Sequence, residues 1–248
     1  EKFEDYVYIS QVLQAEGMGQ AFFTHRISQP FCMGTLYWQL NDCWPVTSWS
    51  GIDYYGRRKA LHYHVKRAFS PVLIRAFEDE NGLHVFAVNE NTDMLKAKFR
   101  WQLTDFNGKI FKEHEENIEL LPQSNERIYL FEDNPTSVED LVFIAEILSE
   151  DQVLSRTFYY FAPTKDMKLE DPGLHFDIEG TKDDIIINIH VEKLARQVFL
   201  EANGCDNYYE DNFFDMGPGT RRKVKYLGSE DIEVLKEKLK IKTIYDTY

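Results

Sequence analysis

The feature that most constrains the fold of this 248-residue chain is a nearly continuous apolar run from Cys32 to Leu40. Its length and composition are typical of a strand that is buried on both faces, as strands of parallel sheets and barrels are. A single strand cannot pair its own backbone edges or cover both of its faces. We therefore expect its neighbouring strands to lie upstream in the protein, or to be absent.

Helical patterns flank this run on both sides. Apolar residues recur at spacings of three and four from Phe3 to Leu13, and Gly17 and Gly19 are expected to interrupt the helix before a second one at 20–27. After a loop, residues 56–69 carry an apolar helical face that ends before a proline. The order helix, strand, loop, helix predicts the last part of an alternating α/β unit. The chain begins inside an amphipathic pattern without an initiator Met, so we expect it to be a piece of a longer protein.

Beyond Pro71 the apolar period changes to two. From Ala97 to Leu103 apolar and polar residues alternate, as in a half-buried strand, and Asn107-Gly108 predicts a hairpin turn. Further strands are predicted at 72–77, 83–88, 127–131, 141–148 and 153–161. Seven or so short strands of this kind predict a β-sandwich.

A charged stretch with Pro and Gly, residues 163–173, predicts a linker to a second all-β unit. Alternating apolar residues at 174–178 and 185–191 predict strands there, and Gly217-Pro218-Gly219 predicts a turn. A short helix is expected to start at Ser229, and a last strand is expected at 241–245.

Composition excludes several classes of function. Lys and Arg number 28 against 42 Asp and Glu, a net charge of −14, so the chain lacks the basic surface that nucleic-acid phosphates require. No apolar run approaches the roughly 20 residues that a membrane-spanning helix needs. Three widely spaced cysteines make neither a disulfide framework nor a metal site. His62 and His64 face different sides of their predicted helix, so we expect no metal and no cofactor.

The densest group of residues suited to ligand binding follows the predicted buried strand. Active sites of α/β barrels lie at the carboxyl ends of the strands, and here Trp38, Asn41, Asp42 and Trp44 occur close together. Indole faces suit the C–H faces of a pyranose, while Asn and Asp oxygens suit sugar hydroxyls. The alternative is structural: both tryptophans would fill a core, and Asp42 would cap a loop.

The stretch from Met33 to Phe69, MGTLYWQLNDCWPVTSWSGIDYYGRRKALHYHVKRAF, resembles the last barrel strand, loop and helix of the β-mannosidases of glycoside hydrolase family 2. The resemblance implies that Trp38 and Trp44 contact the terminal mannose, and that Asn41 and Asp42 organise the loop or the pocket. Residues 211–219, DNFFDMGPG, resemble the last domain of these enzymes, so the resemblance covers essentially the whole chain.

By this resemblance, residues 1–71 are expected to be the last part of a (β/α)8 catalytic barrel, with its final strand at 32–40 and its final helix at 56–69. Residues 72–163 and 164–248 are each expected to form an immunoglobulin-like β-sandwich. The family's retaining mechanism uses an acid/base glutamate and a nucleophile glutamate about 5–5.5 Å apart. Both would lie upstream, so no catalytic residue is assigned to this chain. Asn89-Glu90 shows the letters of the acid/base motif, but it stands in a predicted sandwich, so we interpret it as a coincidence.

The resemblance implies a full-length exo-β-mannosidase, with this segment inactive alone. Its partners would be a β-mannoside oligosaccharide or glycoconjugate and the upstream catalytic domains of the same chain. The periplasm, the bacterial exterior or a lysosome would fit the family.

Three alternatives stay open. The enzyme could act on galactose, glucosamine or glucuronic acid instead of mannose. The sandwiches could bind polysaccharide, with Tyr208-Tyr209 as an exposed aromatic pair. They could also only brace the barrel or mediate a homodimer.

Overall fold

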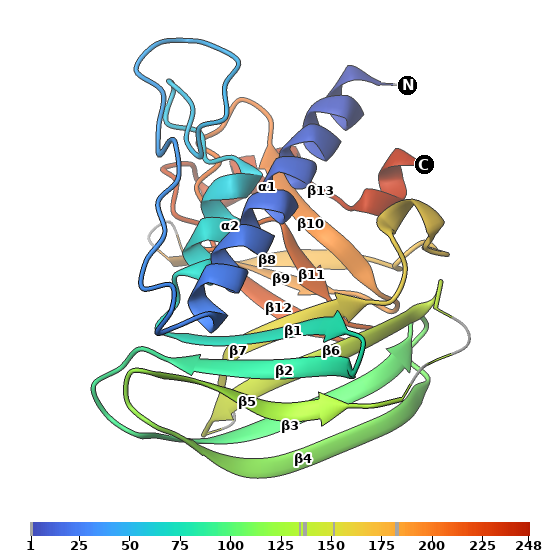
Figure 1. The fold of residues 1–248 in the computed structure, drawn as a ribbon. Coiled ribbons are helices and arrows are strands. Elements are labelled where there is room, and N and C mark those ends of the chain that lie inside the picture. Colours follow the sequence, from blue (N-terminus) through green and yellow to red (C-terminus); the bar gives the residue numbers. More distant parts are fainter. Residues whose placement is uncertain (1, 134, 136–137, 151, 182–183) are drawn as a thin grey trace. The chain divides into compact units, whose positions relative to one another are not determined.

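The computed structural model describes residues 2–133, 135, 138–150, 152–181 and 184–248 (Figure 1). These residues form two compact units, each assembled from separate stretches of the chain. Glu1–Gly19, Leu36–Arg67 and Glu170–Tyr248 make up one, which we name the terminal unit. Gln20–Thr35 and Ala68–Leu169 make up the other, the central unit. The predicted domain boundaries at 71 and 163 stay predictions.

The chain opens with one long helix, α1 (Phe3–Ile27), where two shorter helices were predicted. The two interior glycines cost helix stability, about 1 kcal/mol each relative to alanine, but they keep the backbone hydrogen bonds. Val12 and Ala15 are buried on α1 within the terminal unit, and Phe22 is buried within the central unit. Tertiary burial along the helix therefore outweighs the local preference for a break.

Segment 32–40, where a buried barrel strand was predicted, forms no strand in this structure. The segment has no strand partner among the described residues, and most of its side chains are exposed; Leu36 is 98% exposed. Because backbone groups need a neighbouring strand to form a ladder, an isolated apolar run cannot become a sheet strand. The segment instead leads into a loop and then into α2 (Ala60–Ala68), which starts four residues later than the predicted helix at 56–69.

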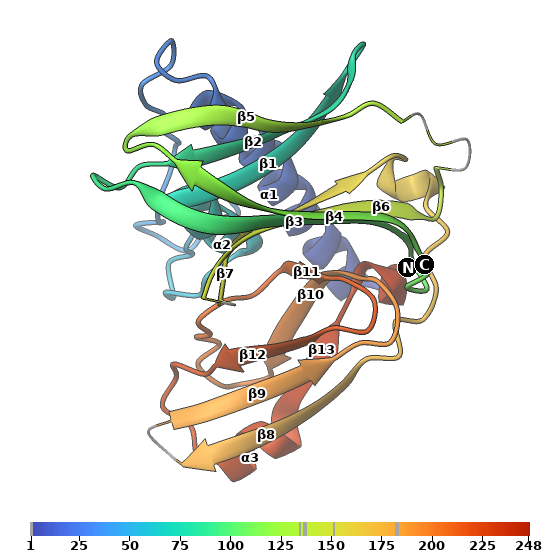
Figure 2. The same cartoon turned by 90° about the horizontal axis from the view of Figure 1, so that it is seen from below.

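The central unit contains a β-sandwich, as predicted. One antiparallel sheet consists of β1 (Val72–Asp79), β2 (Gly82–Asn89) and β5 (Ser124–Phe131). The other has the order β4 (Ile110–Leu120), β3 (Leu95–Asp105), β6 (Leu141–Ser149) and β7 (Gln152–Tyr160). Figure 2 shows these two layers. The core between them includes Phe99, Trp101 and Phe143, which come from the alternating positions of β3 and β6.

Strand β4 was not predicted, because its side chains are largely polar and exposed. It forms one edge of the four-stranded sheet. Its register pairs Lys112 with Leu103, His114 with Trp101 and Glu116 with Phe99. Directly paired residues point to the same face of a sheet, so this edge strand directs polar side chains toward the sandwich interior.

The terminal unit contains the second all-β region. One antiparallel sheet consists of β8 (His175–Thr181), β9 (Asp184–His190) and β12 (Arg221–Lys225). The other consists of β11 (Phe214–Met216), β10 (Ala195–Ala202) and β13 (Leu239–Lys242). Its core is an apolar cluster with aliphatic residues of β9, β10 and α3 (Ile232–Lys238) and the aromatic residues Tyr209, Phe214 and Tyr226. Strand β10 was not predicted, and the last strand ends three residues earlier than the prediction of 241–245.

Short 3-10 turns complete the chain at Thr164–Asp166, inside the predicted linker, and at Ile244–Thr247. None of the described helices is both long enough and apolar enough to span a membrane.

Candidate functional site

The loop between Leu40 and Lys59 is closed by backbone hydrogen bonds at its base. The amide of Asp42 donates to the carbonyl of Ile52 at 3.0 Å, and the amide of Ile52 donates to the carbonyl of Leu40 at 2.9 Å. The amide of Lys59 donates to the carbonyl of Gly51 at 2.9 Å. In Figure 1 this loop precedes the cyan helix α2. Its backbone is therefore fixed at both ends although it contains no regular strand.

Asp42 holds the inside of this loop. Its side chain is 5% exposed, and its two carboxylate oxygens accept hydrogen bonds from the hydroxyls of Ser48 and Ser50, each at 2.7 Å. The amide of Gln39 donates to the same carboxylate at 3.1 Å. The hydrogen bonds from Ser48 and then Ser50 lower the pKa of Asp42 below its usual value, because they favour the charged form. Asp42 is therefore ionised near neutral pH and fully engaged in the loop.

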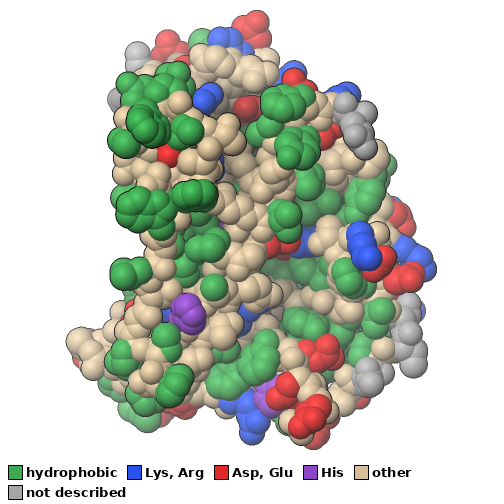
Figure 3. Space-filling view, turned by 45° about the horizontal axis from the view of Figure 1, so that its top comes forward, with side chains coloured by type: hydrophobic (Ala, Val, Ile, Leu, Met, Phe, Trp, Pro, Cys, Tyr) green, Lys and Arg blue, Asp and Glu red, His purple; other side chains and the backbone are tan. Residues whose placement is uncertain are grey.

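The indole rings near Asp42 are exposed. Trp38 is 75% exposed, Trp44 is 67% exposed and Trp49 is 61% exposed. The alternative in which Trp38 and Trp44 fill a core is therefore wrong for this structure. Figure 3 shows apolar side chains gathered on this face of the molecule. Contiguous patches of exposed apolar side chains are typical of surfaces that bind a ligand or another part of a protein.

Asn41 lies at the base of the loop. It pairs with Ile52 as an isolated bridge, and its side-chain amide donates to the carbonyl of Asp42 at 3.2 Å. The structure thus brings Asn41 and Asp42 into one hydrogen-bonded frame, with Trp38 before it and Trp44 after it in the chain.

The sequence does not indicate several residues that hold this hydrogen-bonded loop. Lys59 donates from Nζ to the carbonyl of Ser48 at 3.0 Å, and burial lowers its pKa. Gln14 of α1 donates to the carbonyl of Trp49 at 2.7 Å, and Gln11 accepts from the amide of Ala60 at 3.1 Å. These partners are far apart in sequence and have no characteristic spacing, so only the folded chain identifies them.

Asn89 and Glu90 have contacts of their own in the central unit. Asn89 is buried, and its amide donates to the carbonyl of Leu120 at 3.2 Å. Glu90 forms an ion pair with Arg26 at 3.0 Å, and Arg26 also donates to the carbonyls of Ala68 and Ser70 at 2.6 Å each. Glu90 thus takes part in contacts that hold the end of α1 to the start of the sandwich, whereas Asn89 connects β2 to the end of β4 within the sandwich.

Two shallow clefts lie elsewhere. One of about 320 Å³ in the terminal unit is lined by Tyr55, Arg57 and residues 205–208. One of about 450 Å³ at the open edge of the central sandwich is lined by β3, β4 and β5 side chains that include Trp101, His114 and Tyr129. Tyr209 is completely buried, so Tyr208-Tyr209 does not form the exposed aromatic pair that one alternative suggested. Within the described ranges, no group of three or more His, Cys, Asp or Glu side chains could hold a metal ion.

Two protein families match separate parts of the chain. Residues 81–166 match a family described as a mannosidase Ig/CBM-like domain, and residues 169–247 match an Ig-fold domain family of mannosidases. Both ranges coincide with the β-rich regions described above.

Full-length relatives match nearly all of the chain. It is 28% identical to β-mannosidase B of Aspergillus niger over 95% of this chain and 30% of that protein. It is 26% identical to β-mannosidase of Mus musculus over 91% of this chain and 27% of that protein. The chain thus spans about 30% of the length of the curated relatives that it matches.

Solved structures give the same picture. The β-D-mannosidase of Dictyoglomus thermophilum matches with a TM-score of 0.91 and 28% identity, over 98% of this chain and 30% of that protein. The exo-chitosanase CsxA of Amycolatopsis orientalis matches with a TM-score of 0.73 and 14% identity, over 97% of this chain and 34% of that protein. The second match shows a shared fold alone.

Proposed function

Because this chain is homologous along nearly its whole length to the β-mannosidases of glycoside hydrolase family 2, we propose that it is the C-terminal part of a retaining exo-glycosidase. The full-length enzyme would hydrolyse terminal non-reducing β-D-mannose residues. Its acid/base and nucleophile glutamates would lie in the upstream part of the protein. This chain would supply one wall of the sugar pocket and two immunoglobulin-like domains.

The exposure of Trp38 and Trp44 beside a hydrogen-bonded loop is the observation that carries this proposal. A pyranose presents C–H faces that stack on indole rings. A loop whose backbone is already fixed loses little conformational entropy when the sugar binds. The loop therefore has the chemistry and the rigidity of a sugar-binding wall.

Asp42 does not have the properties of the catalytic acid. A general acid must be protonated near the working pH, whereas the pKa of Asp42 is lowered and its oxygens accept three hydrogen bonds. We propose that Asp42 and Asn41 fix the loop that presents the two indoles, and that neither transfers a proton.

The exposed apolar residues of the first part of the chain support an upstream neighbour. Phe31 and Leu36 precede the loop, and Phe3, Tyr6 and Leu13 lie on α1; all five are largely exposed. In the full-length protein, we propose that segment 32–40 pairs with upstream strands to complete a (β/α)8 barrel, and that upstream segments cover these side chains. The two domains would then brace the barrel.

Substitution of the indoles tests the sugar-binding wall. In the full-length enzyme, we expect Trp38→Ala and Trp44→Ala each to lower kcat/KM for an aryl β-mannoside by about tenfold or more, because each removes about 1.4 kcal/mol or more of binding to the transition state. Tyr248→Ala is the matched control, since Tyr248 is an equally exposed aromatic residue outside the loop. Unchanged kinetics in both tryptophan variants would exclude this role.

A panel of aryl glycosides tests the sugar. We expect the mannoside to have the highest kcat/KM among the mannoside, galactoside, glucosaminide and glucuronide. A clear preference for another sugar would replace the mannosidase assignment with a different family 2 specificity, while the role of the loop would stand.

Glycan binding by the central sandwich is a second candidate function. The match of residues 81–166 to a mannosidase Ig/CBM-like domain favours it, as does the cleft at the edge of the sandwich, where His114 and Tyr129 are partly exposed. Aromatic side chains at the edge of a sandwich are suited to sugar faces. Titration calorimetry of this chain with soluble mannan would detect such binding, and the absence of heat at millimolar ligand would exclude it.

A further inference from the structure

We infer that the last immunoglobulin-like domain positions the loop 40–59 through cationic side chains that bind the backbone of residues 209–213. For its enzymatic consequence this inference rests on the proposed function, since that function makes the loop a wall of the sugar pocket. All of the contacts involved lie within the terminal unit.

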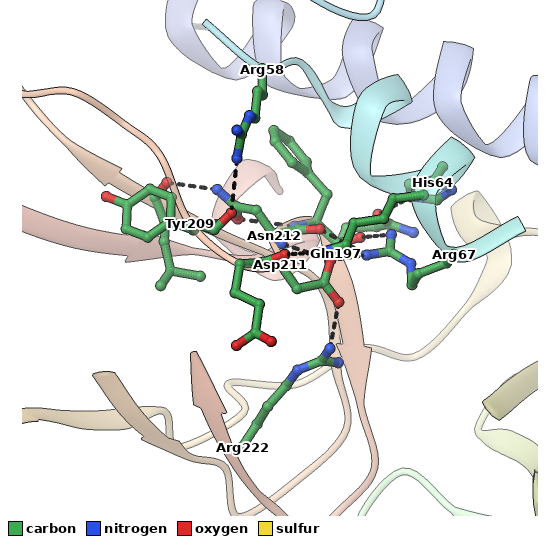
Figure 4. Close-up of polar contacts among 12 residues, drawn as sticks. Arg58, His64, Arg67, Gln197, Tyr209, Asp211, Asn212 and Arg222 are labelled. Carbon is green, nitrogen blue, oxygen red and sulfur yellow. Dashed lines mark hydrogen bonds and ion pairs between the residues drawn. The ribbon is translucent and has the colours of Figure 1, made fainter. Parts of the chain in front are cut away.

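A row of backbone carbonyls accepts hydrogen bonds from these cationic side chains (Figure 4). Arg58 donates to the carbonyl of Tyr209 at 3.4 Å, and Lys66 donates to that of Glu210 at 2.6 Å. Arg67 donates from its two terminal nitrogens to the carbonyls of Asn212 and Phe213, at 3.0 and 2.6 Å. Helix α2 and the residues just before it are thus held at both ends to one short segment of the last domain.

Asp211 is the central acceptor of this network. Its carboxylate contacts Arg67 and Arg222, each at 2.5 Å, and the three side chains are between 15% and 31% exposed. Partly buried, charge-assisted hydrogen bonds are stronger and better defined than exposed ion pairs. The Arg222 guanidinium also lies 3.8 Å from the centre of the Phe214 ring. This contact holds the Arg222 side chain against the last domain.

The segment that supplies the acceptors is itself rigid. The Asn212 side chain forms two hydrogen bonds of 2.9 Å with the backbone of Leu200 in β10. Tyr209 and Phe213, at the two ends of the segment, are buried. The position of the carbonyl row is therefore set by the last domain rather than by α2.

Arg58 and Lys59 connect this network to the candidate sugar-binding residues. Arg58 pairs with Ile52, and Ile52 pairs with Asn41. Lys59 donates to the carbonyl of Ser48, whose hydroxyl donates to Asp42. A displacement of residues 58–59 would therefore move the frame that holds Asp42 and, next to it, Trp44.

The side chains that donate in this network, those of Arg58, Lys66, Arg67 and Arg222, lie outside the buried apolar cluster of the last domain. The acceptor segment is anchored in that cluster through Tyr209 and Phe214. A substitution of a polar side chain of the network therefore removes no residue of the apolar core. Asp211 and Arg67 are in this sense positioning residues, since neither contacts the candidate sugar residues directly.

Hydrogen exchange on this chain tests the positioning. The substitution Asp211→Asn keeps the shape of the side chain and removes its charge. We expect the amides of Asp42, Ile52 and Lys59, which close the loop, to exchange about tenfold faster in this variant, because local opening becomes easier. Exchange in β9 and β10 is expected to stay unchanged.

Asp184→Asn is the matched control, because it removes an exposed ion pair with Lys225 in the same domain. If Asp211→Asn prevents folding, Lys66→Met removes only the bond to Glu210 and is expected to give a smaller acceleration of the same amides. Loop exchange that is equal in wild type, Asp211→Asn and Lys66→Met would overturn the inference.

Kinetics of the full-length enzyme separate this inference from the proposed function. We expect Asp211→Asn to raise KM for an aryl β-mannoside several-fold, with a smaller change in kcat and no loss of folded protein. Faster loop exchange together with unchanged KM and kcat would support the positioning and contradict the role of the loop in the sugar pocket. Slower turnover without faster loop exchange would contradict the positioning itself.

Discussion

His64 combines a titratable group with burial in the interface between α2 and β10. Its Nε2 lies 3.1 Å from Oε1 of Gln197, and burial lowers the pKa of His64 to about 4 from the usual 6.5. Between these two pH values the unfolded chain binds a proton that the folded chain does not. Stability from this group is therefore fully present above pH 6.5 and is lost as the pH falls toward 4.

We expect the free energy of unfolding to fall by about 1–2 kcal/mol between pH 7.5 and 4.5 through His64, which keeps part of its surface in solvent. Urea unfolding of wild type and His64→Gln at both pH values measures this, since glutamine does not titrate. Glu16, whose pKa is raised chiefly by burial, has the opposite pH dependence but is present in both proteins. A difference between the two proteins that does not change with pH would contradict the prediction.

The candidate site shows what can be predicted for single residues. The closeness of Trp38, Asn41, Asp42 and Trp44 follows from their sequence positions. The carboxylate of the buried Asp42 accepts hydrogen bonds from two serine hydroxyls, and serine spacing alone predicts no such bond. Residue types therefore predicted a possible sugar-binding site, whereas the hydrogen bonds of Asp42 could be identified only in the folded loop.

At the scale of elements, α1 shows how tertiary burial overrides a local signal. Gly17 lies in the middle of the helix, and a methyl group added to it would meet no atom within 4 Å. Alanine restricts the unfolded chain more than glycine does and favours the helix.

We therefore expect Gly17→Ala to stabilise the protein by about 0.5–1 kcal/mol, as measured by chemical unfolding. Gly56→Ala is the contrasting variant, because Gly56 has a φ of +81° and its added methyl would lie 2.8 Å from the Tyr208 hydroxyl. It should destabilise the protein. A destabilised Gly17→Ala variant would mean that this face of α1 is constrained by something else.

The strands differ in the interactions that stabilise them. β1, β2, β3, β6 and β9 contain several buried apolar residues each, and their apolar residues placed them close to the predicted ranges. β4 lacks such a face, so its pairing depends on β3 rather than on its own apolar residues. The segment 32–40 is the reverse case: its residues are apolar, yet it is no strand in the described chain because nothing pairs with it.

For the whole molecule, residues 33–39 of the proposed barrel strand 32–40 are expected to be the least protected apolar stretch. They have no ladder hydrogen bonds, whereas β6 lies between β3 and β7. We expect their amides to exchange much faster than those of β6 in this chain. In the full-length protein the same amides should become protected, since upstream strands would pair with them. Equally fast exchange in both proteins would exclude the proposed barrel strand.

The two β-rich regions could be predicted because each contains the alternating residues that form its own core. The barrel could be suggested only by resemblance, since its core would be formed with residues that this sequence does not contain. Local patterns predict a fold to the extent that the partners of each apolar face are present in the same chain.

The inward-facing Lys112, His114 and Glu116 of β4 also bear on how concentrated solutions of this protein behave. An eleven-residue strand at the edge of a sheet offers free amide and carbonyl groups to the same strand of another molecule. Bringing two such edges together would remove these charged side chains from water, and this opposes growth into fibrils. Replacement of these polar residues by valine is expected to increase aggregation through the β4 edge.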